Sequence, residues 1–515
     1  SFIRSGITRL GSGDFRASGE LLPIWGGNSI SGAFGGEFRM ETFSDFRPPF
    51  AGLNPPGSGL DPTTNDFLGF SPNSDTHGIR HVTAANAEVV LPLVGRKFTL
   101  PLVRSLELAA SLRYESYTDF GDTSKPKYGL NWKPTSWMML RASYNEGFRA
   151  PNLAQLFNGS LVRTVTGSND TYRNTVTGLP TDGPSNRRSI ASGNRSLRPE
   201  EAKGKSAGFV IDVPIIKGLS VALDYWEIRQ SDVISSGGGI PDDTAALQAA
   251  TQRLLAAGQS IGAIDLGSGT AAYLGDPSVA RLPVTQADRD FFAAYNARQA
   301  PGNQRAAVGA IDFIKTTYFN KAQQFVNGFD FNLNYKFPKF AIGHFTFNTD
   351  WTYLNDFHAY NSATAPRTEY RNGNSGNVGG ATPVWRGNST LSWRRNQWNA
   401  GVGFYYIGRY TDNGATTTQT TWDSLGNPSY IQPMFNNGSY VYRYVIHDSK
   451  SYNVHLTYRF RSANKYLKNT DIRLGANNVL NAKPPLSADS RGYDVSVYNT
   501  MARGRIYSLQ ITKKL

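Results

Sequence analysis

Cysteine is absent from the chain of 515 residues, which also has only 6 histidines and 18% charged residues. Without cysteine there can be no disulfide framework, thiolate zinc site or cysteine nucleophile. No run approaches the ~18 uninterrupted apolar residues of a membrane helix, and the N-terminal Ser1 to Ser5 lack the apolar core of a signal peptide. The chain is therefore either soluble or crosses a membrane as strands.

Basic residues outnumber acidic ones by 53 to 39, which gives a net charge of +14 at pH 7. A charge of this sign is compatible with nucleic-acid binding. The lysines and arginines are scattered, however, and form no arginine-rich run or recognised nucleic-acid motif. We therefore expect no nucleic-acid partner.

Apolar and polar residues alternate with a period of two along most of the chain. In 329–337 every odd residue is apolar or aromatic and every even residue is polar, a pattern that gives a strand one apolar and one polar face. About fifteen segments show it, long enough for the ~9–11 residues of a tilted strand that crosses hydrocarbon. The predicted strands span 14–22, 30–43, 81–94, 103–118, 124–133, 137–149, 198–213, 219–233, 323–336, 344–358, 382–395, 398–411, 449–461, 470–480 and 501–515.

The connections between these segments alternate in length. Short turns lie near 133–136, 215–218, 338–341 and 394–397. Outer-membrane barrels have short periplasmic turns and long external loops, and backbone groups in lipid must be satisfied by closure into a barrel. We therefore predict an all-β, antiparallel transmembrane barrel whose long loops span about 44–80, 150–197, 234–322, 359–381, 412–448 and 481–500.

The insertion at 234–322 is predicted to contain short helices. Pro241 to Asp243 could start one that stops at Gly258, and Thr285 with Asp288 resembles a capping box ahead of 291–298. A loop this long with its own helices could be a functional lid or a structured crown that shields the rim.

Four motifs in order resemble the barrel of TonB-dependent outer-membrane receptors. The first is Gly-Leu-Asn-Trp-Lys-Pro at 129–134, followed by Gly-Phe-Arg-Ala-Pro-Asn-Leu at 147–153. The others are Gly-Asn-Arg-Ser-Leu-Arg-Pro-Glu at 193–200, Leu-Gly-Ala-Asn-Asn-Val-Leu-Asn at 474–481 and Gly-Arg-Ile-Tyr-Ser-Leu-Gln-Ile at 504–511. The resemblance implies a 22-stranded, plugged transporter.

The chain departs from this family in two respects. It ends Lys513-Lys514-Leu515 where such receptors usually end on Phe, and it shows no N-terminal plug or energy-coupling motif. We therefore expect residues 1–515 to be the C-terminal part of a barrel, with the plug and first strands absent from this chain or supplied by another polypeptide. The expected partners are that plug, a TonB-type energy-coupling protein reached through the missing N-terminal segment, and lipopolysaccharide, whose phosphates the basic excess could pair with.

Sequence motifs typical of hydrolases, phosphate-binding loops and metal sites are incomplete in this chain. Gly204 to Gly208 matches Gly-x-Ser-x-Gly, but a nucleophile elbow needs a strand, a sharp turn and a helix, and here the alternation continues to Ile211. Pro199 stands where a phosphate-binding loop requires glycine. His77 and His81 have a metal-ligand spacing for a helix, but they lie in a loop leading into a strand without a third ligand. We expect no enzyme activity, no catalytic residue, no metal and no cofactor.

Two groups of residues are candidates for the site. Charged residues on the lumenal face could line a transport path or contact the plug, and plug contact is favoured because buried charges need partners. Aromatic loop residues could contact a ligand, because rings offer flat area at low entropic cost. The lumenal group is Arg113, Glu115, Asp224, Asp330 and Asp350; the loop group is Tyr172, Tyr273, Phe291, Tyr295, Tyr360 and Trp422.

The resemblance implies an energy-coupled receptor in the outer membrane of a Gram-negative-type bacterium that takes up a scarce solute: a siderophore, cobalamin, a glycan or a similar small molecule. A passive porin or an adhesion or assembly barrel is the alternative. A soluble carbohydrate-binding β-protein is a third possibility, and it predicts solubility without detergent.

Overall fold

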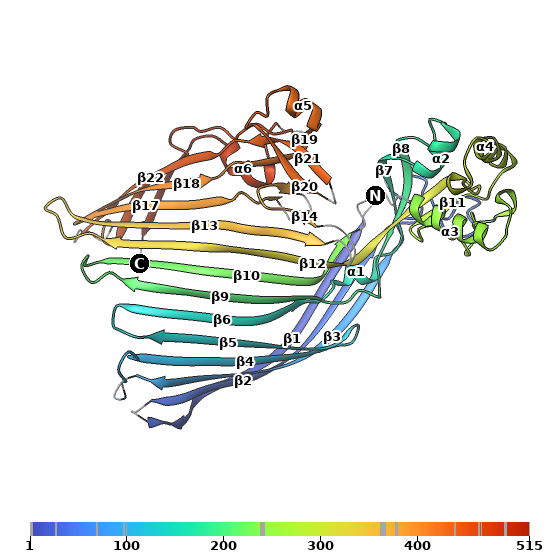
Figure 1. Ribbon diagram of the computed structural model, residues 1–515. Helices are drawn as coiled ribbons and strands as arrows, with labels where there is room; N and C mark the ends of the chain where they lie inside the picture. Colours follow the sequence, from blue (N-terminus) through green and yellow to red (C-terminus); the bar gives the residue numbers. More distant parts are fainter. Residues whose placement is uncertain are drawn as a thin grey trace.

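The computed structural model describes residues 4–25, 28–67, 71–95, 98, 100–236, 243–360, 367–375, 380–436, 439–461, 464, 466–488 and 492–513. Within them the chain forms a curved antiparallel wall of fifteen long strands (Figure 1). In pairing order these are β1 (Ser5–Pro23), β2 (Ser29–Phe46), β3 (Thr76–Val94), β4 (Ser105–Tyr117), β5 (Gly121–Lys133), β6 (Met138–Arg149), β9 (Glu200–Asp212), β10 (Leu219–Ser236), β12 (Ile311–Lys336), β13 (His344–Tyr360), β17 (Trp385–Arg395), β18 (Trp398–Ile407), β22 (Ser449–Arg459), β23 (Thr470–Asn477) and β24 (Ile506–Lys513).

Each predicted segment corresponds to one of these strands, so the predicted all-β antiparallel fold is confirmed. β1 pairs with β2 and β24 with β23, and neither has a second neighbour in the described part of the chain. No helix among the described residues is long and apolar enough to cross a membrane.

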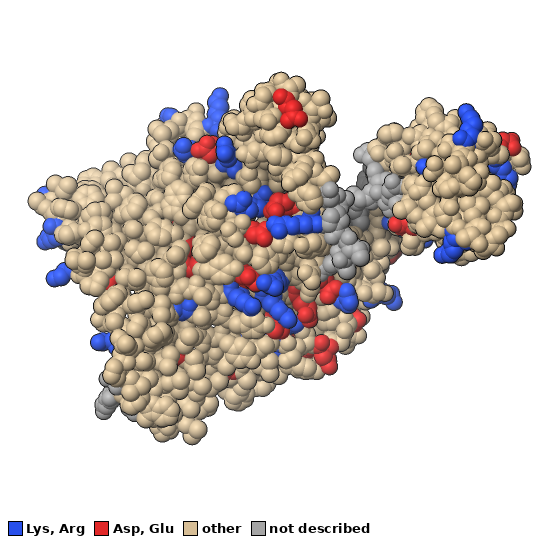
Figure 2. All heavy atoms as spheres, in the orientation of Figure 1, with Lys and Arg blue, Asp and Glu red and all other residues tan. Residues whose placement is uncertain are grey.

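The outer face of the wall is apolar and open. The register places Leu112 opposite Pro126 and Phe329 opposite Tyr353, and on this face Leu112 and Tyr128 are 49% and 53% exposed. Figure 2 shows the middle of the wall largely free of charged side chains, which gather near its loop end and, as Lys and Arg, along its turn end. Extensive exposed apolar surface is costly in water but suits strands that face lipid.

The two ends of the wall differ as predicted. Short turns join the strands at one end, and the long loops with all the helices extend from the other (Figure 1). The loop elements are α1 (Leu153–Phe157), β7 (Leu161–Ser168), α2 (Thr171–Thr177), β8 (Ser185–Ser192), α3 (Thr244–Ala256), β11 (Val279–Arg281), α4 (Gln286–Asn296), β14 (Thr368–Glu369), β15 (Asn374–Ser375), β16 (Gly380–Ala381), β19 (Tyr410–Thr417), α5 (Gln419–Ser424), β20 (Ile431–Asn436), β21 (Ser439–Ile446) and α6 (Val495–Ala502).

Both predicted loop helices are present. In α4 the Thr285 hydroxyl accepts from the backbone of Asp288, whose carboxylate accepts in return from Thr285, so the capping box forms. The other helix, α3, has Asp243 at its N-cap, and Gly258 follows its end with a φ of 86°, a conformation that favours glycine. Pro241 and Asp242 of that prediction lie outside the described residues.

Two long loops fold together into one unit, which we call the loop domain (residues 161–192 and 243–310). Helices from both loops share an apolar core, and Figure 1 shows the unit projecting beyond the rim of the wall. A separate core means that the domain holds its own shape. The buried core residues are Tyr172, Leu247, Ala250, Ile264, Leu266, Phe292, Ala306 and Val308.

Several predicted boundaries are wrong. β12 begins at Ile311 rather than near 323, because its first residues pair in parallel with β8, from Phe313 opposite Arg188 to Thr317 opposite Ser192. The predicted loop 412–448 contains the small sheet β19–β21–β20. His77 and His81 lie within β3, not in a loop.

Candidate functional site

The five predicted lumenal residues all lie on the inner face of the wall. The register aligns Asp224 with Asp330 on β12 and with Gly208 on β9, which pairs with Arg141 of β6. Nε and Nη2 of Arg141 donate to the two carboxylate oxygens of Asp224 at 2.7 and 2.5 Å. Because Gly208 has no side chain, Arg141 reaches Asp224 across the strand between them. The carboxylate of Asp224 is therefore paired with the Arg141 guanidinium on the inner face of the wall.

Arg113 and Glu115 belong to a second inner-face network. Arg113 donates to Glu115 and, at 3.0 Å, to Glu37, which also accepts from Arg39 at 2.8 Å. The Tyr117 hydroxyl donates to Glu115 at 2.6 Å. These charges alternate in sign and pair with one another. Of them Glu115 is buried and needs such a partner, whereas the Arg113 side chain is 41% exposed. A role in plug contact or transport remains a prediction for them.

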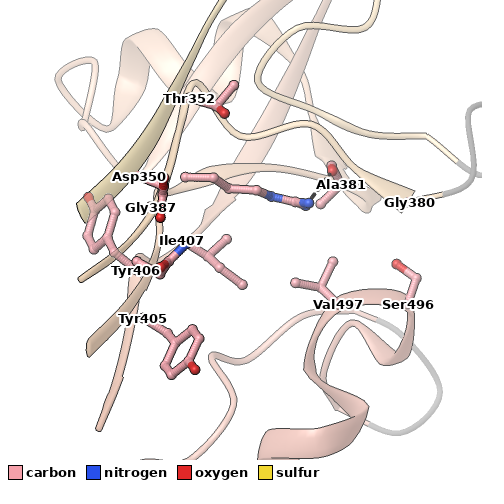
Figure 3. A pocket seen from close by; sticks show the side chains of 12 residues that line it. Asp350, Thr352, Gly380, Ala381, Gly387, Tyr405, Tyr406, Ile407, Ser496 and Val497 are labelled. Carbon is pink, nitrogen blue, oxygen red and sulfur yellow. Dashed lines mark hydrogen bonds between the residues drawn. The ribbon is translucent and has the colours of Figure 1, made fainter. Parts of the chain in front are cut away.

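Asp350 lines the pocket drawn in Figure 3, whose volume is about 630 Å³. Its inner wall comes from β13, β17 and β18, where Asp350 pairs with Asn388 and Asn388 with Tyr405. Val497 and Ser496 of α6 close the opposite side (Figure 3). The lining residues are Asp350, Thr352, Gly380, Ala381, Arg386, Gly387, Asn388, Tyr405, Tyr406, Ile407, Ser496 and Val497. We call this cavity the lumenal pocket.

The pocket presents groups of both charges and an aromatic ring. Nη2 of Arg386 donates to the Ala381 carbonyl at 3.0 Å, and the Asp350 carboxylate accepts from the Asn332 amide. Tyr405 is 46% exposed and faces the cavity. More than half of the lining residues are polar, and they stand beside the apolar side chains of Ile407 and Val497. The pocket therefore offers hydrogen-bonding groups and some apolar contact to a small molecule.

The position of α6 is fixed by its own loop contacts. Asp494 caps the helix by accepting from Ser496, and it accepts the Tyr410 hydroxyl at 2.9 Å. Tyr498 packs in a buried cluster with Ala381 and Tyr410, and burial raises the pKa of Tyr498 to about 12. The side of the pocket that α6 forms is therefore held in place by buried contacts.

The six predicted loop aromatics do not form one site, although Tyr172, Tyr273 and Tyr295 all lie in or beside the core of the loop domain. Tyr172 is fully buried in the loop domain and donates to the Ala306 carbonyl at 3.0 Å, and burial raises its pKa to about 12. Tyr273 donates to Asp243, and Tyr295 lies beside the guanidinium of Arg305.

The remaining three aromatics differ in surroundings. Phe291 is 39% exposed on α4. Tyr360 ends β13 with its ring edge-on to His358, and Trp422 of α5 packs against Tyr442. Ligand contact by these residues remains a prediction.

Sequence reasoning missed Arg386, Tyr405 and Ser496. Alternation within 382–395 could have placed Arg386 on the inner face, because its neighbour Trp385 faces outward. The position of Asp494 before an apolar segment is an N-cap signal for α6. The Gly204–Gly208 motif lies inside continuous β9 without a turn, which excludes a nucleophile elbow.

An antiparallel wall with an apolar outer face, a charged inner face and long loops at one end is the architecture of an outer-membrane β-barrel. The family model for the TonB dependent receptor-like β-barrel matches residues 4–479, and the chain belongs to this family. Barrels of this family are outer-membrane proteins of Gram-negative bacteria, and the family and its structural neighbours are receptors rather than enzymes.

Solved structures show the same fold. The siderophore receptor PirA from Acinetobacter baumannii matches with a TM-score of 0.55 and 14% identity over 98% of this chain and 55% of that chain. The ferric enterobactin receptor PfeA in complex with BCV-L6 matches with a TM-score of 0.56 and 15% identity, over 98% of this chain and 54% of that one; PfeA is a protein of Pseudomonas aeruginosa. The chain therefore spans about half the length of these receptors.

Among curated proteins, the heme/hemopexin utilization protein C of Haemophilus influenzae (strain 86-028NP) is 31% identical over 144 residues. The match covers 26% of this chain and 16% of that protein.

Proposed function

We propose that the receptor containing this chain takes up an iron-bearing solute across the outer membrane, and that this chain supplies the barrel wall, the external loops and the lumenal pocket. The observation that carries the proposal is the pocket itself, which lies on the inner wall at the loop end and is closed by α6. The siderophore and ferric enterobactin receptors of the same fold and the heme/hemopexin utilization relative support an iron-containing solute over cobalamin or a glycan.

In this mechanism the loops admit the solute and the pocket holds it. Arg386 offers hydrogen bonds to an acidic edge of the solute, Asp350 accepts from donor groups, and Tyr405 stacks on a flat surface. Release into the periplasm requires energy, which a TonB-type coupling protein provides through a plug. Lipopolysaccharide surrounds the outer wall, where the basic residues near the loops pair with its phosphates.

The proposal is tested in a Gram-negative strain whose own iron-chelate receptors have been deleted. The gene encoding the receptor is restored, and growth under iron restriction is measured with ferric enterobactin, other ferric siderophores or hemin as the iron source. We expect growth on at least one of them, lost when the coupling protein is deleted. No growth on any iron source would contradict the proposal, and growth independent of coupling would instead support a passive porin.

The pocket is tested with Arg386→Gln. Loss of charge-assisted hydrogen bonds should reduce uptake about tenfold or more. The matched control is Arg459→Gln at the turn end, where Arg459 is 62% exposed and pairs with Asp471 at 2.9 Å. Equal uptake by the two variants would exclude the pocket from the solute path.

A further inference from the structure

A second cavity of about 510 Å³ lies at the rim of the wall, away from the lumenal pocket. It opens where β1 and β2 reach the loop end and is covered by the loops that follow β2 and α1. Hydrogen bonds join these two loops: Val162 N donates to Pro72 O at 2.8 Å, and Ser74 N donates to Ser160 O at 3.0 Å. The cavity is therefore framed by connected backbone. Its lining includes Arg4, Phe43, Asp45, Arg47, Leu161 and Arg163.

The charge balance of this rim cavity is positive. Nε and Nη2 of Arg4 donate to the two oxygens of Asp45 at 2.8 and 2.7 Å, which neutralises the one carboxylate in the lining. Arg47 contacts the same carboxylate at 3.2 Å, and the side chain of Arg163 has no hydrogen bond or ion pair among the described residues, although its backbone pairs with Ser189. Two guanidinium charges thus remain without their own anion.

Arg47 provides a separate observation. Its side chain is 12% exposed, and its Nη1 is buried with no hydrogen-bond partner in the described part of the chain. A buried donor without an acceptor is costly, and such groups are rare in folded proteins. An acceptor brought by a ligand would remove this cost.

The rest of the lining includes the apolar residues Phe43, Pro48 and Leu161 together with Asn73 and Asn158. A planar guanidinium matches the geometry of a carboxylate, which can accept two parallel hydrogen bonds. We propose that the rim cavity is a binding site for a carboxylate attached to an apolar, aromatic body, with Arg47 and Arg163 holding the carboxylate and Phe43 packing against the ring. This site does not depend on the identity of the transported solute, so its failure would leave the proposed uptake function standing.

The test is calorimetric titration of the full chain in detergent with 2-naphthoate, and with 2-naphthamide as a neutral analogue of the same shape. We expect saturable binding of 2-naphthoate and at least tenfold weaker binding of 2-naphthamide, because charge-assisted hydrogen bonds are the strong ones. Equal binding of both probes, or no binding of 2-naphthoate, would overturn the proposal.

Variants locate the binding. Arg47→Gln and Arg163→Gln should each weaken 2-naphthoate binding about tenfold, whereas Arg47→Lys should bind between the wild type and Arg47→Gln because it keeps the charge and loses the planar fork. Arg163 is exposed and unpaired, so its substitution tests the site even if Arg47→Gln folds poorly. The control is Arg195→Gln, since Arg195 lies over Phe157 of α1 and outside the cavity. Wild-type binding by Arg163→Gln would refute the assignment.

Discussion

Removing the buried guanidinium of Arg281 should open the loop domain while leaving the barrel wall intact. Arg281 has no exposed surface and donates from Nη1 to Asp170 at 2.6 Å and to the Gly309 carbonyl at 2.9 Å. Its Nη2 donates to Asp243 at 3.0 Å, and its Nε to the Tyr273 hydroxyl at 2.8 Å. Burial opposes the charge, but the hydrogen bonds and charge of Asp170 outweigh burial and raise the pKa of Arg281. Arg281 therefore joins the two loops as a charged group.

The size of the expected destabilisation follows from the two carboxylates that lose their cation. Arg281→Met keeps much of the aliphatic volume but leaves Asp170 and Asp243, 1% and 4% exposed, without their cation. Breaking a buried ion pair from one side costs about 3–5 kcal/mol. At 1.4 kcal/mol for each factor of ten, the opening equilibrium of the loop domain should rise about 10²- to 4 × 10³-fold.

Hydrogen exchange measured by mass spectrometry on the detergent-solubilised chain reads this equilibrium directly. Amides of α2, α3 and α4 should exchange faster by that factor, whereas amides of β5 and β6 should be unchanged. Arg289→Ala, on the exposed face of α4, is the control and should leave exchange as in the wild type. Unchanged exchange in α2 and α3 of Arg281→Met, or an equal increase in the wall, would refute the reasoning.

Three further predictions follow from single contacts. Burial opposes ionisation of Asp288, but hydrogen bonds from Thr285 and Arg173 outweigh it and lower its pKa from the usual 3.8; the stability that it contributes is therefore fully present above 3.8 and is lost as the pH falls through the lowered pKa, so protection of the α4 amides, corrected for the intrinsic exchange rate, should fall on acidification in the wild type but not in Asp288→Asn. Gly208→Val should slow barrel assembly, seen as loss of heat-modifiable gel mobility, because a Cβ there would lie 2.5 Å from the Leu223 carbonyl; normal mobility would contradict the close packing. Asp494→Ala should destabilise α6 by about 1–2 kcal/mol through loss of its cap, measured as faster exchange confined to that helix.

The wall was predictable because its signal is local. A period of two within about ten residues reports which face of a strand is apolar, and the lipid-facing positions of segments such as 329–337 need no knowledge of neighbouring strands. The capping box of α4 was predictable for the same reason, since Thr285 and Asp288 lie one turn apart. The start of β12 was not, because its first residues pair with β8, more than a hundred residues earlier in the chain.

The lumenal pocket depends on contacts between residues that lie far apart in the sequence, and spacing along the chain does not predict them. Arg386 and Tyr405 meet Asp350 through the register of three strands, and Ser496 enters from a loop that returns from far along the chain. Tyr172 is an aromatic residue in a predicted loop, as ligand-binding residues often are, yet it is buried because two loops share one apolar core. Loop residues become core residues when loops fold together, and no local pattern reports this.

The continuity of β12 has a consequence for how such receptors diversify. At about 3.3 Å per residue, its 26 residues form one ribbon about 86 Å long that runs from the membrane wall into the loop domain. The buried ion pairs of Arg173 and Arg281 and the apolar core lie within the domain, which is attached along that ribbon and its neighbours. The loop domain can therefore be exchanged for one with different surface chemistry during evolution, while the strands of the wall keep their register.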